Sequence, residues 1–343
     1  MEKHKVNFGL NTTYYTLFPG KQLPLNDISS VPPQTLQEEQ ALEYSLYMSD
    51  EYKISPLITL SGGIRLNLFL TLGPETEYIY RDDLPLSTET VTDTVYYKKG
   101  QVAAFYPGLE YRFTSRFLIS PGLSLKAGFQ RMYQYIHMIS NTTAISPTDI
   151  WKLSDRYIKP TTSDQFSLGV YKNLGHNILE TSAEVYYKFL GNILDYKNGA
   201  RLLMNEHLET DILNGKGKAY GIELMVRKST GNITGWVSYT YSRILHKVNG
   251  NFAVEKVNNG EYFPADYDKP HDLKLVVNAK MSRRFNVTAN FMYSTGRPIT
   301  FPAGYYSFGN INRIFYSERN EFRIPDYMRL DLAATLNGNL KRK

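Results

Sequence analysis

The chain has 343 residues and a formal net charge of +6, and it contains 28 Tyr and 17 Phe but only 2 Trp and no Cys. The absence of cysteine excludes a disulfide framework and a thiolate metal site. Lysines and arginines are spread along the chain instead of being focused on one element, so nucleic-acid binding is not expected. No stretch of about 18 uncharged apolar residues is present, so the sequence predicts no transmembrane helix.

Alternation of apolar and polar residues with a period of two recurs along the whole chain, and this is the pattern of strands with one apolar face. Ile222, Leu224 and Val226 share one face, for example, while Glu223 and Arg227 share the other. The pattern predicts about twelve strands, most of them near the ten residues that a tilted strand needs to cross a bilayer. In chain order they cover residues 5–16, 42–49, 58–68, 105–113, 123–130, 165–171, 182–189, 220–227, 236–242, 272–280, 286–294 and 328–335.

The predicted connections between these strands alternate between long and short. Tight periplasmic turns and long extracellular loops are typical of a membrane β-barrel, whereas a soluble sandwich has no reason to place every long loop at one end. Both ends of the wall are then expected on the periplasmic side. Short turns are expected at Ser49–Lys53, Thr114–Arg116, Asn173–His176, Ser229–Asn232 and Ser282–Arg284, and long loops at residues 18–37, 71–100, 136–161, 194–215, 248–268 and 297–325.

Alternation alone does not distinguish an apolar face packed into a dry core from an apolar face turned to lipid. The opposite face carries charged side chains within the strands, such as Arg112, Glu184 and Asp331, and these suit a wet lumen as well as the surface of a sandwich. The loop asymmetry decides between them. The predicted fold class is therefore all-β, a transmembrane antiparallel up-and-down β-barrel.

No arrangement of residues typical of catalysis or metal binding is found in the sequence. The chain has no HExxH motif, P-loop or nucleophile elbow. Metal sites usually need convergent ligands at short spacing, and the histidines are scattered. We therefore expect no enzyme activity, no catalytic residue, no cofactor and no metal, and we interpret the histidines as loop and rim residues: His4, His137, His176, His207, His246 and His271.

Tyr157-Ile158-Lys159-Pro160 is followed by Gln165-Phe166-Ser167-Leu168-Gly169, which together form a "KP … SDQ … LG" passage. This passage resembles one in the barrels of TonB-dependent outer-membrane receptors of the Bacteroidetes type. The run from Gly217 to Leu224 resembles the "G-x-a-x-G-i-E" strand of that family. Asp268-Lys269-Pro270-His271 and Ile324-Pro325-Asp326-Tyr327 resemble its last barrel passages. The order and spacing of the pieces carry the resemblance, which is strongest over residues 157–336.

The resemblance implies a barrel of about 22 strands whose lumen holds an N-terminal plug. It also implies TonB-energised active uptake of a siderophore, cobalamin, glycan or peptide through the bacterial outer membrane. The N-terminus carries no secretory signal. Residues 1–343 are therefore expected to be a partial receptor barrel domain, truncated at both ends, with the plug domain and the final strands absent.

The resemblance also implies the partners, which are TonB through the missing plug region, outer-membrane lipids, the ligand, and a surface lipoprotein as a further candidate. Aromatic side chains in the last long loop could stack on a sugar or a siderophore, and we take Tyr305, Tyr306, Phe315 and Tyr316 as the candidate ligand contacts. Two alternatives stay open. One is a complete twelve-strand barrel that acts as a passive pore or an outer-membrane enzyme, and the other is a soluble all-β binding domain.

Overall fold

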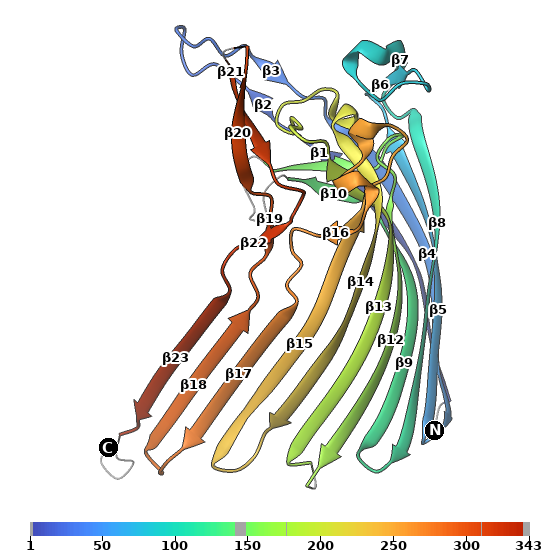
Figure 1. Cartoon of the computed structure of the whole chain (residues 1–343). Helices are drawn as coiled ribbons and strands as arrows, with labels where there is room; N and C mark the ends of the chain where they lie inside the picture. Colours follow the sequence, from blue (N-terminus) through green and yellow to red (C-terminus); the bar gives the residue numbers. More distant parts are fainter. Residues whose placement is uncertain (1–2, 141–148, 176, 310, 339–343) are drawn as a thin grey trace.

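The computed structural model describes residues 3–140, 149–175, 177–309 and 311–338. Most of them form one antiparallel sheet, a tall curved wall whose strands follow one another in chain order (Figure 1). Each predicted strand lies inside one wall strand, so the predicted all-β architecture is confirmed. The wall consists of β1 (His4–Leu17), β4 (Glu39–Ser55), β5 (Ile58–Leu72), β8 (Val102–Ser120), β9 (Leu123–Gln134), β12 (Thr161–Leu174), β13 (Leu179–Tyr196), β14 (Ile212–Lys228), β15 (Ile233–Lys247), β17 (His271–Lys280), β18 (Phe285–Ser294) and β23 (Tyr327–Leu336).

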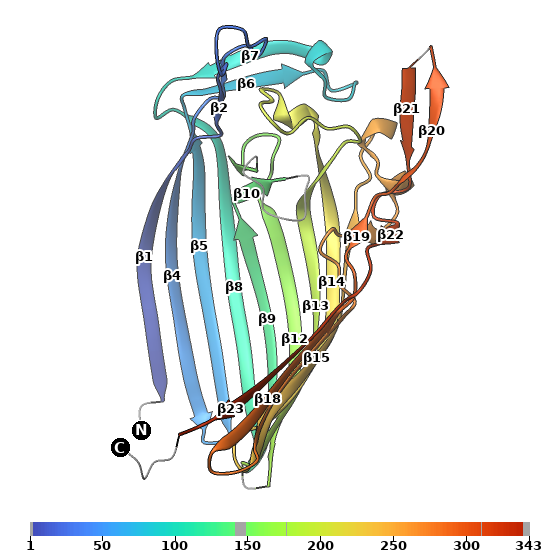
Figure 2. The same ribbon diagram turned by 90° about the vertical axis from the view of Figure 1, so that its left-hand side faces the viewer.

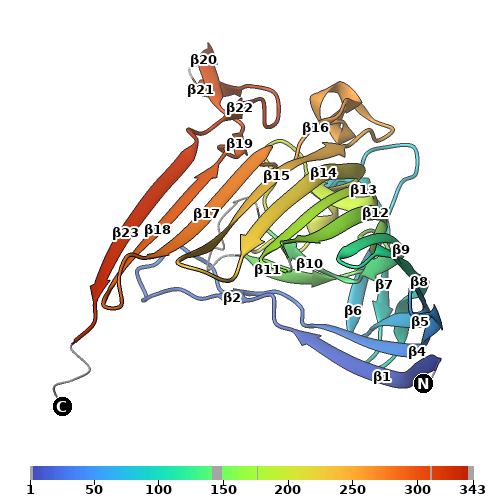
Figure 3. The same ribbon diagram turned by 90° about the horizontal axis from the view of Figure 1, so that it is seen from below.

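The wall is open at its sides. Among the described residues β1 pairs only with β4 and β23 pairs only with β18, so the sheet does not close on itself as a complete twelve-strand barrel would. Seen from the turn end, the two outer strands lie far apart across a concave space (Figure 3). The start of β1 and the end of β23 lie at the same end of the wall, as predicted (Figure 2).

Cross-strand register collects the apolar side chains into continuous rows on the convex face. Residues paired across a sheet share a face, so one matching row fixes the orientation of each strand it crosses. Phe129 and Phe166 lie in such a row, with ring centroids 4.4 Å apart. Polar residues occupy the alternate rows on the concave face. One convex row contains Phe113, Phe129, Phe166, Tyr187 and Tyr220, and one concave row contains Glu184, Glu223, Thr240, Asp272 and Ser294.

No second layer of the described residues covers the convex face. Phe8 is 79% exposed, Leu46 59% and Leu330 59%, although all three are large apolar residues in mid-wall rows. The buried apolar clusters instead lie at the loop end, around Phe69 and around Ile139. A soluble protein rarely leaves so large a continuous apolar surface uncovered. The alternative of a soluble sandwich is therefore wrong.

Two of the predicted turns are wrong. Residues Ser49–Lys53 and Thr114–Arg116 lie inside β4 and β8, and the chain turns instead at residues 56–57 and 121–122. Both segments are rich in polar residues, as turns often are. In the structure these polar residues belong to long strands that continue past them. Gly122 follows Pro121 and has φ +83, a left-handed conformation that glycine adopts without strain because it has no Cβ atom. The turns at Ser229–Asn232 and Ser282–Arg284 lie where predicted, and His176 of the fifth turn is outside the described residues.

The long loops contain short hairpins of their own, which the strand pattern did not predict. These are β2 (Lys21–Gln22) with β3 (Gln34–Thr35), β6 (Glu75–Tyr80) with β7 (Val91–Tyr97), β10 (Ile136–Ile139) with β11 (Ile150–Leu153), β19 (Pro298–Ile299) with β22 (Phe322–Arg323), and β20 (Pro302–Phe308) with β21 (Ile311–Tyr316). β16 (Phe263–Pro264) extends the wall beside β15. The only helices in the described residues are four 3-10 turns, η1 (Thr88–Thr90), η2 (Leu208–Thr210), η3 (Ala253–Glu255) and η4 (Asn258–Gly260), and none of them is long and apolar enough to cross a membrane.

A charge on the convex face should destabilise the wall, whereas the same charge one residue away on the concave face should not. Ala289 lies in a convex apolar row between Val277 and Leu332, and Asn290 lies on the concave face beside Asp331. We expect Ala289→Arg to lower the free energy of unfolding in lipid vesicles by about 2–4 kcal/mol, the cost of an arginine in the middle of the bilayer. The matched control Asn290→Arg should change it little, and equal losses for the two variants would contradict the assignment of the faces.

Candidate functional site

A hairpin folds over the concave face at the loop end of the wall. The β10–β11 hairpin lies inside the curve of the sheet (Figure 3), where Leu153 packs into a buried cluster with Ala41 and Phe69. The ring of Phe69 stacks on that of Tyr135, with centroids 4.7 Å apart. The hydroxyl of Thr71 donates a hydrogen bond of 2.6 Å to the carbonyl of Ser154. The β11 side of the 136–161 loop is therefore fixed to the inner surface of β4 and β5.

Buried ion pairs reinforce this attachment. The Nζ atom of Lys152 lies 2.9 Å from Oε1 of Glu39 and 2.9 Å from Oδ2 of Asp155. The other oxygen of Glu39 accepts the backbone N–H of Leu153 at 2.8 Å. A lone charge in such a position would be costly, but here the ammonium faces two carboxylates, and one carboxylate also accepts a backbone N–H. Burial lowers the pKa of Lys152, but Asp155 and Glu39 raise it by more, so its pKa lies well above the ordinary value.

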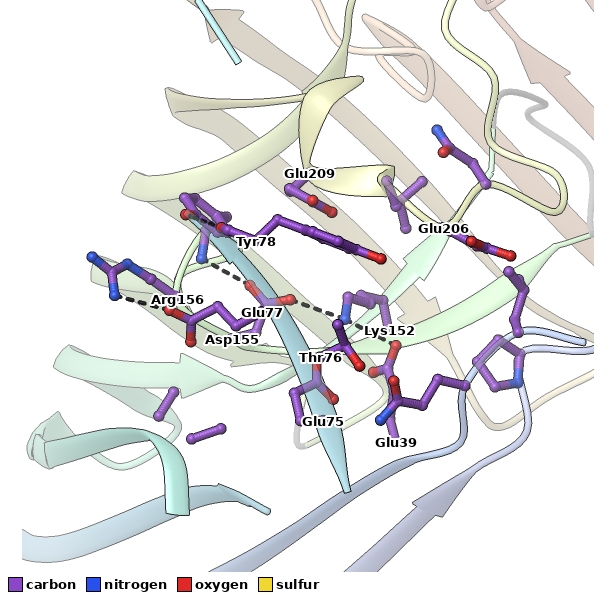
Figure 4. Close-up of a pocket in the computed structure, with 18 of the residues that line it drawn as sticks. Glu39, Glu75, Thr76, Glu77, Tyr78, Lys152, Asp155, Arg156, Glu206 and Glu209 are labelled. Carbon is purple, nitrogen blue, oxygen red and sulfur yellow. Dashed lines mark hydrogen bonds and ion pairs between the residues drawn. The ribbon is translucent and has the colours of Figure 1, made fainter. Parts of the chain in front are cut away.

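Next to the β10–β11 hairpin lies a cavity of about 310 Å³ among the loops. Figure 4 shows how the side chains of β4, β6, β11 and the 197–211 loop converge on it. Two cations, Lys152 and Arg156, face a larger number of carboxylates, so the lining is acidic, and Tyr78 and Tyr157 add aromatic surface. The carboxylates in the lining are Glu39, Glu75, Glu77, Asp155, Glu206 and Glu209.

The carboxylates of this cavity differ in their surroundings. Glu77 accepts from Nη1 of Arg156 at 2.8 Å and from the Tyr97 hydroxyl at 3.3 Å. Tyr80 donates a hydrogen bond to Glu209, whose pKa is raised by burial. Burial raises the pKa of Glu75 to about 7, against the opposing attraction of Lys152. Glu75 therefore changes charge near neutral pH, which makes the charge of the cavity dependent on pH.

A second set of buried charges holds the last loop against the wall. Asp268 is fully buried, with Nε of Arg243 at 3.3 Å, and Arg323 forms a second ion pair with it. The backbone N–H of Ile244 donates to the same carboxylate at 2.7 Å. Arg319 forms an ion pair with Asp195 at the loop end of β13. These contacts place the base of the 297–325 loop, while its tip projects as the β20–β21 hairpin (Figure 2).

The predicted ligand contacts all lie on this projecting hairpin. Tyr306, Phe315 and Tyr316 line a wide hollow of about 890 Å³, whereas Tyr305 does not line it. All four side chains are exposed, Tyr305 most of all at 80%. The structure thus places three of the four aromatic residues around one space, and Tyr305 is not among the residues that line it. Arg319, which also lines the hollow and fixes its base, was not predicted, because its ion pair joins residues far apart in the sequence.

The acidic cavity was also not predicted. Its lining comes from segments far apart in the sequence, among them β4, β6, β11 and the 197–211 loop, so no local motif contains it. Of the histidines that were interpreted as loop and rim residues, His137 is buried and its Nε2 lies 3.0 Å from the Ser154 hydroxyl. Burial lowers the pKa of His137 to about 4, so it is a neutral packing residue at ordinary pH.

Comparison with known proteins identifies the wall. Residues 3–342 match the family model described as "TonB dependent receptor-like, beta-barrel". The chain belongs to the TonB-dependent receptor β-barrel family. It is therefore a bacterial outer-membrane protein, whose short turns are periplasmic and whose long loops are extracellular. No curated protein matches this receptor sequence.

Solved structures of similar fold include receptors and a transporter. The ferric-catecholate import receptor Fiu from E. coli K12 is 16% identical with a TM-score of 0.59, and the match covers 98% of this chain and 46% of Fiu. The siderophore receptor PiuA from Acinetobacter baumannii is 15% identical with a TM-score of 0.60, covering 98% and 47%. The copper transporter OprC is 11% identical with a TM-score of 0.60, covering 99% and 47%. This receptor chain thus spans about half the length of these proteins, and the likeness shows the fold.

Removing the ammonium of Lys152 should release the β10–β11 hairpin from the wall. Lys152→Met leaves Glu39 and Asp155 buried without a cation, and breaking such a pair costs about 3–5 kcal/mol. We expect the backbone amides of β10 and β11 to exchange with deuterium at least a hundredfold faster, while the amides of β17 and β18 keep their protection. The double variant Lys152→Met with Glu39→Gln should recover part of the protection. Unchanged exchange in the single variant would show that the ion pairs do not hold the hairpin.

The stability of the loop cluster should depend on the protonation of Glu75. The pKa of this group is about 7 in the folded protein and 4.5 for the free side chain, so the folded state binds the proton more tightly. Its contribution is favourable below pH 4.5 and is lost as the pH rises to 7. After correction for intrinsic exchange, the β6–β7 amides should be better protected at pH 5 than at pH 8. Glu75→Gln should remove this difference and the exposed Glu89→Gln should keep it, whereas a pH slope that survives in Glu75→Gln would contradict the prediction.

Proposed function

We propose that this chain takes part in TonB-energised active uptake of a nutrient ligand across the outer membrane. The observation that carries the proposal is the contrast between an apolar convex face, which suits lipid, and a polar concave face. At its loop end the concave face holds the fixed β10–β11 hairpin, and the loops there form the acidic cavity and the hollow beside the β20–β21 hairpin. A ligand that arrives from outside meets these hollows before it reaches the concave side. Binding followed by gating requires no covalent chemistry. Membership of a receptor family supports the expectation that the protein is not an enzyme.

We propose further that residues 1–343 act as a partial barrel domain. The unpaired edges of β1 and β23 support this, because each backbone group without a partner in lipid costs several kcal/mol. In the working receptor, further strands would pair with these edges, and a plug would occupy the concave side and bind TonB. The solved relatives, which are about twice as long, are consistent with such additional parts.

The ligand contacts that we propose are Tyr305, Tyr306, Phe315 and Tyr316. The hollow beside the β20–β21 hairpin has the size of a small-molecule site, which is about 300–1,000 Å³. Exposed aromatic faces can stack on a sugar ring or on the aromatic groups of a siderophore. The proposed ligand class is therefore a siderophore, cobalamin, a glycan or a peptide, and a surface lipoprotein over the loop end is a further proposed partner.

A transport assay tests the proposal. The complete receptor gene would be expressed in a host without its own receptors, and uptake of a ferric catecholate, cobalamin, an oligosaccharide and a peptide would be followed with and without TonB. We expect one class to accumulate against its gradient only when TonB is present. Uptake that is independent of TonB and proportional to the outside concentration would identify a passive pore and overturn the proposal.

Loss of the hairpin aromatics should weaken uptake at low ligand concentration. Aromatic stacking contributes about 0.5–1.5 kcal/mol for each pair, so Tyr306→Ala combined with Tyr316→Ala should raise the KM for uptake about 5- to 150-fold with little change at saturation. Tyr96→Ala is the matched control, because Tyr96 is 74% exposed on the β6–β7 hairpin and lines neither hollow. An equal effect of the control variant would show that the β20–β21 aromatics have no special role.

A further inference from the structure

The convex face of β14 changes its chemistry along the strand. Every second residue lies on this face, and beyond Lys228 at the periplasmic end these residues are apolar, then aromatic, then cationic. On the same face the neighbouring strand β15 ends in Lys247, which pairs with Lys216 across the two strands. The column on β14 consists of Lys228, Val226, Leu224, Ile222, Tyr220, Lys218 and Lys216.

Two lysines of these columns lie close to one tyrosine, and a third, Lys216, pairs with one of the two across the strands. The Nζ atom of Lys218 lies 4.2 Å from the ring centroid of Tyr262, and that of Lys247 lies 5.4 Å from it. Tyr262 directly precedes β16, which pairs with β15 at the loop end of the wall (Figure 1). We call Lys216, Lys218, Lys247 and Tyr262 the lysine patch. Among the described residues no carboxylate forms an ion pair with any of its three lysines, unlike Arg243 one row below, which pairs with Asp268.

The lysine patch lies at the height of the outer edge of the membrane. Lys228 occupies the same column at the periplasmic end of β14, ten residues before Lys218 is reached. At about 3.4 Å per residue and a tilt of about 40°, ten residues rise about 26 Å. The apolar band of such walls is about 25 Å tall. The two lysines therefore bracket the band, and the lysine patch begins where the outer-leaflet headgroups begin.

Like charges on paired strands repel one another, so Lys216 beside Lys247 is unfavourable without a counter-ion. The stems of lysines at a membrane edge pack on apolar surface while their ammonium groups reach the headgroup level. Tyr262 restricts where two of these lysines can reach, because its ring contacts the ammonium groups of Lys218 and Lys247. The arrangement therefore presents converging cations, continuous with the lipid-facing surface, to the headgroup region.

We propose that the lysine patch binds the phosphate groups of an anionic lipid of the outer leaflet. Charge complementarity favours an anion, and continuity with the apolar columns below favours an anion that carries acyl chains. Each lysine at such a surface strengthens binding by about 1 kcal/mol, or about fivefold. The three together should therefore contribute about a hundredfold. The inference is independent of the nutrient ligand, because the lysine patch lies on the convex face and not around either hollow.

The test measures binding of bisphosphorylated lipid A to the full receptor in a neutral detergent, with dephosphorylated lipid A as the second probe. We expect the triple variant Lys216→Gln, Lys218→Gln and Lys247→Gln to bind the phosphorylated lipid at least tenfold more weakly than the wild type. Lys228→Gln, at the opposite end of the same column, should bind within twofold of the wild type. The binding should also weaken as salt is raised, because exposed charges are screened.

The other outcomes overturn the proposal. Equal binding of phosphorylated and dephosphorylated lipid by the wild type would show that acyl chains alone are recognised. Competition by millimolar inorganic phosphate, with no dependence on the acyl chains, would identify a free-anion site instead. Unchanged binding by the triple variant would place the lipid elsewhere. Heat-modified migration on a gel and circular dichroism of each variant would confirm that the compared proteins are folded.

Discussion

The structure depends on one constraint, which is that a wall in lipid must pair its backbone polar groups internally while showing only apolar side chains to the lipid. Water is absent from the bilayer core, so an unpaired N–H or C=O group has no alternative partner. A sheet of long antiparallel strands pairs the backbone N–H and C=O groups with one another. Successive side chains of a strand point to opposite faces, so they alternate between lipid and the wet concave side. The register of the wall follows, because a slip of one residue would turn Glu184 toward lipid and Val185 toward the lumen.

This constraint is local in the sequence, and that is why the wall could be predicted. Each strand shows its two faces within about ten residues. The strand ends were harder to predict, because the polar residues of a concave face resemble those of a turn. Thr114–Arg116 was misread in this way, although the chain turns at Pro121 and Gly122, where proline and positive φ coincide. Turn chemistry was therefore a better guide to strand ends than polarity.

The loop end follows different rules and could not be read from the sequence. Arg319 pairs with Asp195 across 124 residues, and Tyr80 bonds to Glu209 across 129. Neither pair leaves a pattern in either segment, since each residue on its own looks like an ordinary loop charge or loop aromatic. The β20–β21 aromatics could be selected by residue type alone. Residue type did not reveal that Tyr306, Phe315 and Tyr316 would line the hollow while Tyr305 would not.

The two ends of the molecule are thus stabilised by separate forces. The wall is held by its hydrogen-bond ladder and by lipid, whereas the loops are held by buried charges such as Lys152 and Asp268. Both of these charges lie where loops meet the loop end of the wall, so they fix the bases of the loops and leave the tips free of the wall. A receptor family can then vary the tips of its loops without disturbing the sheet. At the β10–β11 base the ion pair with Glu39 reaches directly onto the wall strand β4, so a change in its charges would be felt on the concave side.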